Sequence, residues 1–91
     1  MKTVHLLITG KVQGVFFRES ARKLAEKLNI KGWIKNRPDE KVEAMISGDE
    51  SDINDFINWC HTGPERAEVA DVIVSQQSES KFEKFKVIRN H

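Results

Sequence analysis

The chain has 91 residues, and its 15 basic and 14 acidic residues give a formal charge of +1 at pH 7. This near-balance argues against nucleic acid or a membrane surface as the partner, because proteins of both classes usually carry a basic excess. Hydrophobic residues make up 38% without a long apolar run, which excludes a transmembrane helix and a secretory signal, and the length predicts one small domain, residues 1–91.

The first third of the chain predicts a strand, a glycine turn and a helix. Residues 4–9 are mostly apolar and predict the strand, and Gly10 and Gly14 mark the turn that follows it. Residues 17–28 are predicted as a helix because their apolar side chains recur at the spacing of one helical face, namely Ala21, Leu24, Ala25 and Leu28.

The rest of the chain predicts a hairpin, a second helix and two more strands. Strands are expected at residues 32–37 and 42–47, with a turn at Pro38 and Asp39 between them. The second helix begins in the polar cluster at 49–52 and ends at Gly63, because its apolar stripe again has helical spacing, namely Ile53, Phe56, Ile57 and Cys60. Further strands are predicted at 69–75 and 85–89, with 76–81 as a loop.

This order of elements predicts the fold class. A hairpin flanked by two helical crossovers favours an antiparallel sheet of four strands, or five with the short last strand, and both helices on one face. That architecture is the ferredoxin-like α/β sandwich, an α+β fold.

The run from Gly10 to Arg18 is the part of the sequence that points to chemistry. Backbone N–H groups at the start of a helix are unpaired and carry partial positive charge, and glycine lets a ligand approach the backbone, so an anion is the expected guest. Arg18 opposes the helix dipole, which marks it as a candidate for function. From these residues alone, a tight turn with a surface arginine is an equally good interpretation.

Other reactive side chains have ordinary explanations. His5, His61 and His91 lack metal-ligand spacing, and Cys60 continues an apolar helical stripe. With one cysteine, no intrachain disulfide can form, and a cytoplasmic location is expected.

Two strand residues have both a functional and a structural interpretation. Trp33 could stack on a ligand, but an aromatic side chain facing the core is favoured. Asn36 ends a predicted strand, and the residues alone favour a turn residue bonded to its own backbone.

Two motifs resemble the acylphosphatase family in order and spacing: the run from Gly10 to Arg18 and the run Gly32-Trp33-Ile34-Lys35-Asn36. The resemblance extends over nearly the whole chain. It implies the ferredoxin-like fold and a monomeric hydrolase that cleaves the carboxyl–phosphate bond of acyl phosphates, with no metal or cofactor. Phosphate or sulfate is expected to compete with the substrate.

The resemblance also implies the site residues. Arg18 stands at the position of the family's substrate-binding arginine and Asn36 at that of its catalytic asparagine. The phosphate is expected on a loop formed by Gly14, Val15, Phe16, Phe17 and Arg18. Two positions depart from the family pattern: Glu40 stands where many relatives have glycine, and Phe16 places a bulky ring in the loop.

Two rival functions use a related architecture. One is a non-catalytic ferredoxin-like module that binds an acyl or carbamoyl phosphate, since fold alone does not decide function. The other is an RNA-recognition domain, which would need a basic, aromatic-rich strand. Residues 42–47, Val-Glu-Ala-Met-Ile-Ser, are neither basic nor aromatic.

Overall fold

Seven elements follow one another in the computed structural model, which describes residues 1–89. Their order confirms the predicted one, and His91 lies outside the described residues. The elements are β1 (Lys2–Lys11), α1 (Phe17–Lys27), β2 (Lys31–Asn36), β3 (Val42–Gly48), α2 (Glu50–Thr62), β4 (Glu68–Gln77) and β5 (Phe85–Ile88).

Strands β1 and β4 are longer than predicted because they pair with each other almost from end to end. Gln76 and Gln77, which were expected in a loop, lie opposite Val4 and Thr3 of β1 and belong to β4. Both glutamines are exposed, so they lack the apolar alternation from which a strand is predicted. Pairing with β1, rather than local pattern, extends this strand.

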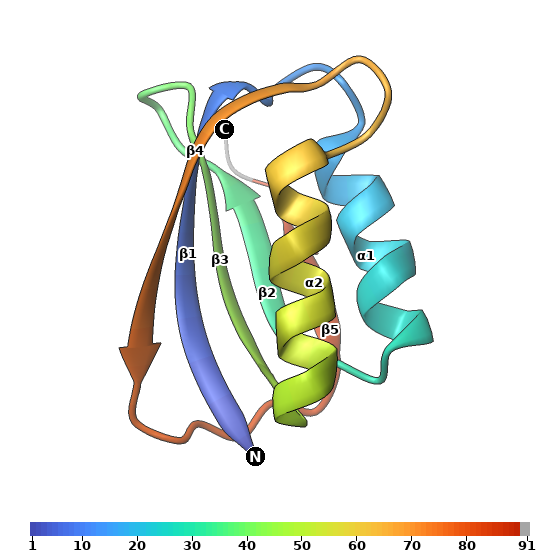
Figure 1. Ribbon diagram of the computed structural model, residues 1–91, viewed down its shortest axis with the longest axis vertical. Helices are drawn as coiled ribbons and strands as arrows, with labels where there is room; N and C mark the ends of the chain where they lie inside the picture. The colour runs from blue at the N-terminus through green and yellow to red at the C-terminus, as the bar shows by residue number, and fades with distance from the viewer. Residues whose placement is uncertain (90–91) are drawn as a thin grey trace.

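The strand order is β4-β1-β3-β2-β5, and the first four strands in this order pair antiparallel as predicted. The fifth strand corrects the prediction of a wholly antiparallel sheet, because β5 pairs parallel to β2 and the sheet is mixed. The reason is visible in Figure 1: the chain leaves β4 at the end of the sheet where β2 begins, so β5 runs in the direction of β2.

Both helices cover one face of the sheet, as predicted (Figure 1). α1 packs against β5 and β2, and α2 packs against β4 and β3. Alternate residues of the central strands enter the core between the layers, and none is more than 1% exposed: Val4, Leu6, Ile8, Ile34, Val42, Ala44 and Ile46. Within residues 1–89, no helix has the length and apolar character needed to span a membrane.

The topology brings four chain segments to one end of the sheet. β1 and β2 both pair antiparallel with β3, so they run in the same direction and finish at the same end of the sheet. α1 begins at this end, directly after β1 and the loop that follows it. β5 is parallel to β2 and finishes at this end too. The ends of β1 and β2 lie at the top of Figure 1. The loop of residues 12–16, Asn36 and Arg89 therefore meet at this end of the sheet.

Candidate active site

The loop of residues 12–16 joins β1 to α1 and is anchored by two valines. Val12 and Val15 are 1% and 4% exposed, so their side chains hold the loop to the core. Gly14 has φ 74° and Phe16 has φ 65°, both in the left-handed region. That conformation is easy for glycine but costs a non-glycine residue about 1–2 kcal/mol. The Phe16 ring is 74% exposed and stands outside the core.

The first turn of α1 offers backbone donors to a ligand. Phe16 is the residue that caps the helix, and no side chain within the described residues bonds to the cap. The first N–H groups of an α-helix have no partner inside the helix. They are therefore unpaired donors within α1, at the positive end of the helix dipole.

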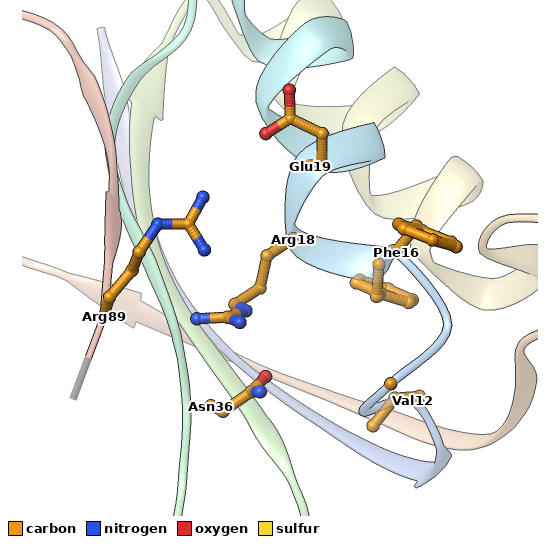
Figure 2. A pocket seen from close by; sticks show the side chains of 8 residues that line it. Val12, Phe16, Arg18, Glu19, Asn36 and Arg89 are labelled. Carbon is orange, nitrogen blue, oxygen red and sulfur yellow. The ribbon is translucent and has the colours of Figure 1, made fainter. Parts of the chain in front are cut away.

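Arg18 extends from this first turn into the space between α1 and β2 (Figure 2). One guanidinium N–H donates to the Ile88 carbonyl oxygen at 3.3 Å. Partial burial, and then the positive charge of Arg89, lower the pKa of Arg18 from its ordinary value. Because an arginine remains charged in proteins, the guanidinium groups of Arg18 and Arg89 repel each other in this space. An anion bound between them would offset that repulsion.

Asn36 is the last residue of β2, and its side chain and the Arg18 guanidinium point into the same space between β2 and α1 (Figure 2). Its Oδ1 atom is buried and has no hydrogen-bond partner among the described residues. A buried acceptor without a partner costs about 1–3 kcal/mol, so such an atom calls for an explanation. A guest that donates a hydrogen bond in the pocket would supply one.

A pocket of about 460 Å³ includes most of the predicted site. The structure brings together Gly14, Phe16, Phe17, Arg18 and Asn36, whereas the Val15 side chain packs in the core. The remaining lining residues are Val12, Glu19 and Arg89.

Sequence reasoning missed Arg89. Its position depends on the parallel pairing of β5 with β2, and nothing in the residues around it predicts that pairing.

Glu19 lines the pocket but its carboxylate is bonded to Arg22 on the same helix. The hydrogen bond from Arg22 is the main cause that lowers the pKa of Glu19, and this carboxylate is ionised at neutral pH.

The other candidates lie away from the pocket. The His5 Nε2 atom lies 2.6 Å from the Glu43 Oε2 atom. Trp33 faces away from the helices, and the Lys35 ammonium lies 5.3 Å from the centre of its ring. The expectation that Trp33 faces the core is therefore wrong. Cys60 is buried, which raises the pKa of its thiol. Among residues 1–89, no three His, Cys, Asp or Glu side chains are grouped to hold a metal ion.

Known proteins resemble this chain in sequence and in fold. Residues 4–87 match the model of the acylphosphatase family. An acylphosphatase of Thiobacillus denitrificans is 47% identical over 76 residues, which are 84% of this chain and 85% of that protein. One of Rubrobacter xylanophilus is 43% identical over 79 residues, covering 87% of this chain and 72% of the relative.

A solved structure agrees with the fold. The crystal structure of acylphosphatase from Bacillus subtilis matches with a TM-score of 0.94 and 30% sequence identity. The match covers 98% of this chain and 100% of that one.

Proposed function

Because the chain belongs to the acylphosphatase family and hydrolyses acyl phosphates, we propose that the pocket between α1 and β2 is where the carboxyl–phosphate bond is cleaved. The buried, unpartnered Oδ1 atom of Asn36, in the same pocket as the Arg18 guanidinium, is the observation that carries this assignment. Within residues 1–89, the fold supplies no hydrogen-bond partner for this atom. Because the atom is covered in the structure, the Asn36 side chain would turn slightly to accept a hydrogen bond from a bound water.

The phosphate would be held by backbone and side chain together. N–H groups at residues 14–18 are the donors, with Gly14 allowing the left-handed turn that exposes them. Arg18 adds a planar fork of donors that fits two phosphate oxygens. Its bond to the Ile88 carbonyl uses one guanidinium nitrogen and leaves the others for the phosphate.

Asn36 would hold the attacking water through its Oδ1 atom. A carboxamide does not accept a proton at neutral pH, so Asn36 orients the water and is not a general base. The water oxygen forms a bond to phosphorus while the bond from phosphorus to the acyl oxygen breaks. The acyl group leaves as a carboxylate. One proton of the water passes to a phosphate oxygen and the other stays on the attacking oxygen, which yields inorganic phosphate.

This division of labour suits the substrate. A carboxylate is already a good leaving group, so the reaction does not depend on a strong general acid. Positioning of the water and neutralisation of phosphate charge are sufficient, and both are large effects in phosphoryl transfer. The rival interpretation as a non-catalytic module for an acyl or carbamoyl phosphate has no comparable support, since relatives named as the enzyme match most of the chain.

Four further properties belong to this proposal. Inorganic phosphate and sulfate compete with the substrate, because the loop binds a tetrahedral anion. Residues 1–91 act as one domain, supported by the family match at 4–87 and by a sheet that uses strands from both halves. The chain works as a monomer. Its location is cytoplasmic, as the lone buried cysteine suggests.

A phosphate titration followed by amide NMR tests the site. We expect inorganic phosphate to shift the backbone amides of residues 14–18 and the Arg18 Nε–H, while the amides of Thr3 and Ser47 at the other end of β1 stay in place. Benzoyl phosphate hydrolysis should continue in a chelator and be inhibited by phosphate, and phosphate monoesters should react poorly. Shifts elsewhere, or activity that a divalent ion restores, would contradict the proposal.

A further inference from the structure

Gln13 connects two parts of the site, although it does not line the pocket. Its Nε2 atom donates to the Arg37 carbonyl oxygen at 2.8 Å and to the Lys41 carbonyl oxygen at 2.9 Å. A side-chain amide has two protons to donate, and both are used here. The two bonds span 24 and 28 residues of sequence and tie the 12–16 loop to the hairpin between β2 and β3.

The acceptors lie where the hairpin leaves the site. Arg37 directly follows Asn36, and its N–H donates to the same Lys41 carbonyl oxygen at 2.8 Å. This carbonyl therefore accepts one bond from the hairpin and one from Gln13. On the other side, Gln13 directly precedes Gly14, the first residue of the phosphate loop.

Apart from Gln13, the hairpin end is held by bonds within the hairpin: the Arg37 N–H donates to the Lys41 carbonyl oxygen, and the Arg37 guanidinium donates to the Asp39 and Glu43 carboxylates. Its turn residues Pro38, Asp39 and Glu40 are exposed, so the core does not hold them. The 12–16 loop is held by Val12 and Val15, which are buried. Gln13 therefore holds the peptide next to Asn36 at a fixed place relative to the 12–16 loop, which is itself fixed to the core.

We propose that Gln13 is a positioning residue for acyl phosphate hydrolysis, which sets the place of Asn36 relative to the phosphate loop. The inference rests on the role proposed for Asn36 as the residue that holds water. Gln13 does not touch the substrate. Its loss therefore moves the water and leaves the phosphate donors, which belong to residues 14–18, in place.

The test replaces Gln13 by methionine, which keeps the length of the side chain and removes the donors. We expect the kcat of Gln13→Met to fall about 10- to 100-fold, because a displacement of about 1 Å at a reacting atom has effects of that size. The inhibition constant of phosphate should change by less than about threefold. A structural clip without a role in positioning would lower the melting temperature and leave kcat unchanged.

Thr3→Val is the matched control. Thr3 also takes part in two long-range hydrogen bonds, with the Ser47 hydroxyl at 3.1 Å and the Ser80 N–H at 3.2 Å, but at the far end of β1. Both variants lose two bonds, and only Gln13→Met should lose kcat when each is measured well below its melting temperature. An equal loss of kcat in the two would show that weakened stability is the cause and would overturn the inference.

A double variant separates this inference from the proposed function. If Gln13 acts through Asn36, then Gln13→Met adds less than about twofold to the loss in Asn36→Ala. Independent, multiplying losses overturn the inference. If Asn36→Ala alone retains full kcat, the proposed role of Asn36 has failed. If Asn36→Ala is slow and Gln13→Met is not, only the role of Gln13 has failed.

Gln13→Glu gives a second readout with almost no change of volume. At neutral pH its carboxylate has no proton for the two carbonyl oxygens, and kcat should be low. Carbonyl oxygens favour the protonated form, so kcat relative to the unchanged chain should rise as the pH falls from about 7 to about 5. A ratio that is constant with pH would contradict the proposed donor role.

Discussion

The two ends of the sheet differ in whether their buried polar side chains have hydrogen-bond partners. At the end where β1 begins, the hydroxyls of Thr3 and Ser47 are buried and bonded to each other, and Thr3 also accepts the Ser80 N–H. At the end where β1 and β2 finish, Asn36 Oδ1 is buried without a described partner, and Arg89 adds its charge to the space of Arg18.

The backbone shows the same contrast only in part. Among the described residues, three non-glycine residues have a left-handed φ: Phe16 and Glu40 at the site end, with φ 65° and 68°, and Asn29 at the far end, with φ 58°. Asparagine adopts this conformation at a lower cost than phenylalanine or glutamate. Strain and unpaired polar atoms destabilise the folded chain, and they persist where a ligand uses them. The far end contributes stability, whereas the site end gives up stability for binding. This contrast predicts opposite responses of stability and activity to substitution at the two ends.

Arg18→Ala is the substitution with the largest expected effect on activity. Phosphate binding and hydrolysis should both fall to background, because the variant loses the charge and the donor fork together. Arg18→Lys should restore little, since an ammonium lacks the planar fork. Isothermal titration with phosphate and benzoyl phosphate kinetics measure the two losses, after circular dichroism has shown that each variant is folded. Substantial hydrolysis by Arg18→Ala would contradict the assignment.

Asn36→Ala should separate binding from catalysis. We expect kcat to fall about 10²-fold or more, the scale of a lost transition-state group, with phosphate affinity nearly unchanged. The melting temperature should stay the same or rise, because the variant removes a buried acceptor that has no partner. If phosphate affinity falls as far as in Arg18→Ala, Asn36 is part of the phosphate site instead.

Thr3→Val should show the reverse pattern at the far end. Removing the hydroxyl leaves the buried Ser47 and the Ser80 N–H without a partner, at a cost of about 1–2 kcal/mol. For a chain of this size, that lowers the melting temperature by about 4–8 °C per kcal/mol. Thermal unfolding and kcat at 25 °C test the pattern together, and an unchanged melting temperature would break the comparison.

Glu40→Gly should stabilise the hairpin turn. Glycine adopts φ 68° without the steric cost that Glu40 meets, and the expected gain is about 1 kcal/mol, less the greater freedom of glycine in the unfolded chain. The measurement is the denaturation midpoint in urea. A lower midpoint would mean that the Glu40 side chain contributes more than its backbone costs, and kcat should change little in either case.

The smallest expected effect concerns acid stability. The hydrogen bond from His5, and then the charges of His5, Lys35 and Arg37, lower the pKa of Glu43 below its ordinary value of 4.5. The stability that this carboxylate contributes is therefore complete above pH 4.5 and is lost as the pH falls through the lower pKa of the folded state. Glu43→Gln should flatten the acid limb of the stability curve, as measured by the urea midpoint between about pH 3 and about pH 6, and an unchanged acid limb would contradict this role of Glu43.

Local pattern was enough to predict most of the fold. Helical spacing located both helices, and Pro38 with Asp39 located the hairpin. The motif around Gly14 predicted the loop before α1. Glu40, which stands where the resemblance expects glycine, has φ 68°, in the region that glycine favours. Each of these features is decided by a few neighbouring residues, so a short stretch of sequence is sufficient to predict it.

What the sequence determined by itself is the order of elements and the identity of Arg18 and Asn36 as candidates. Tertiary structure alone decided that β5 runs parallel to β2, that Arg89 and the Ile88 carbonyl reach Arg18, and that Asn36 Oδ1 is left without a partner. These facts depend on contacts between residues far apart in the chain. Their free energy comes from burial and pairing across the whole sheet, and no local preference records it.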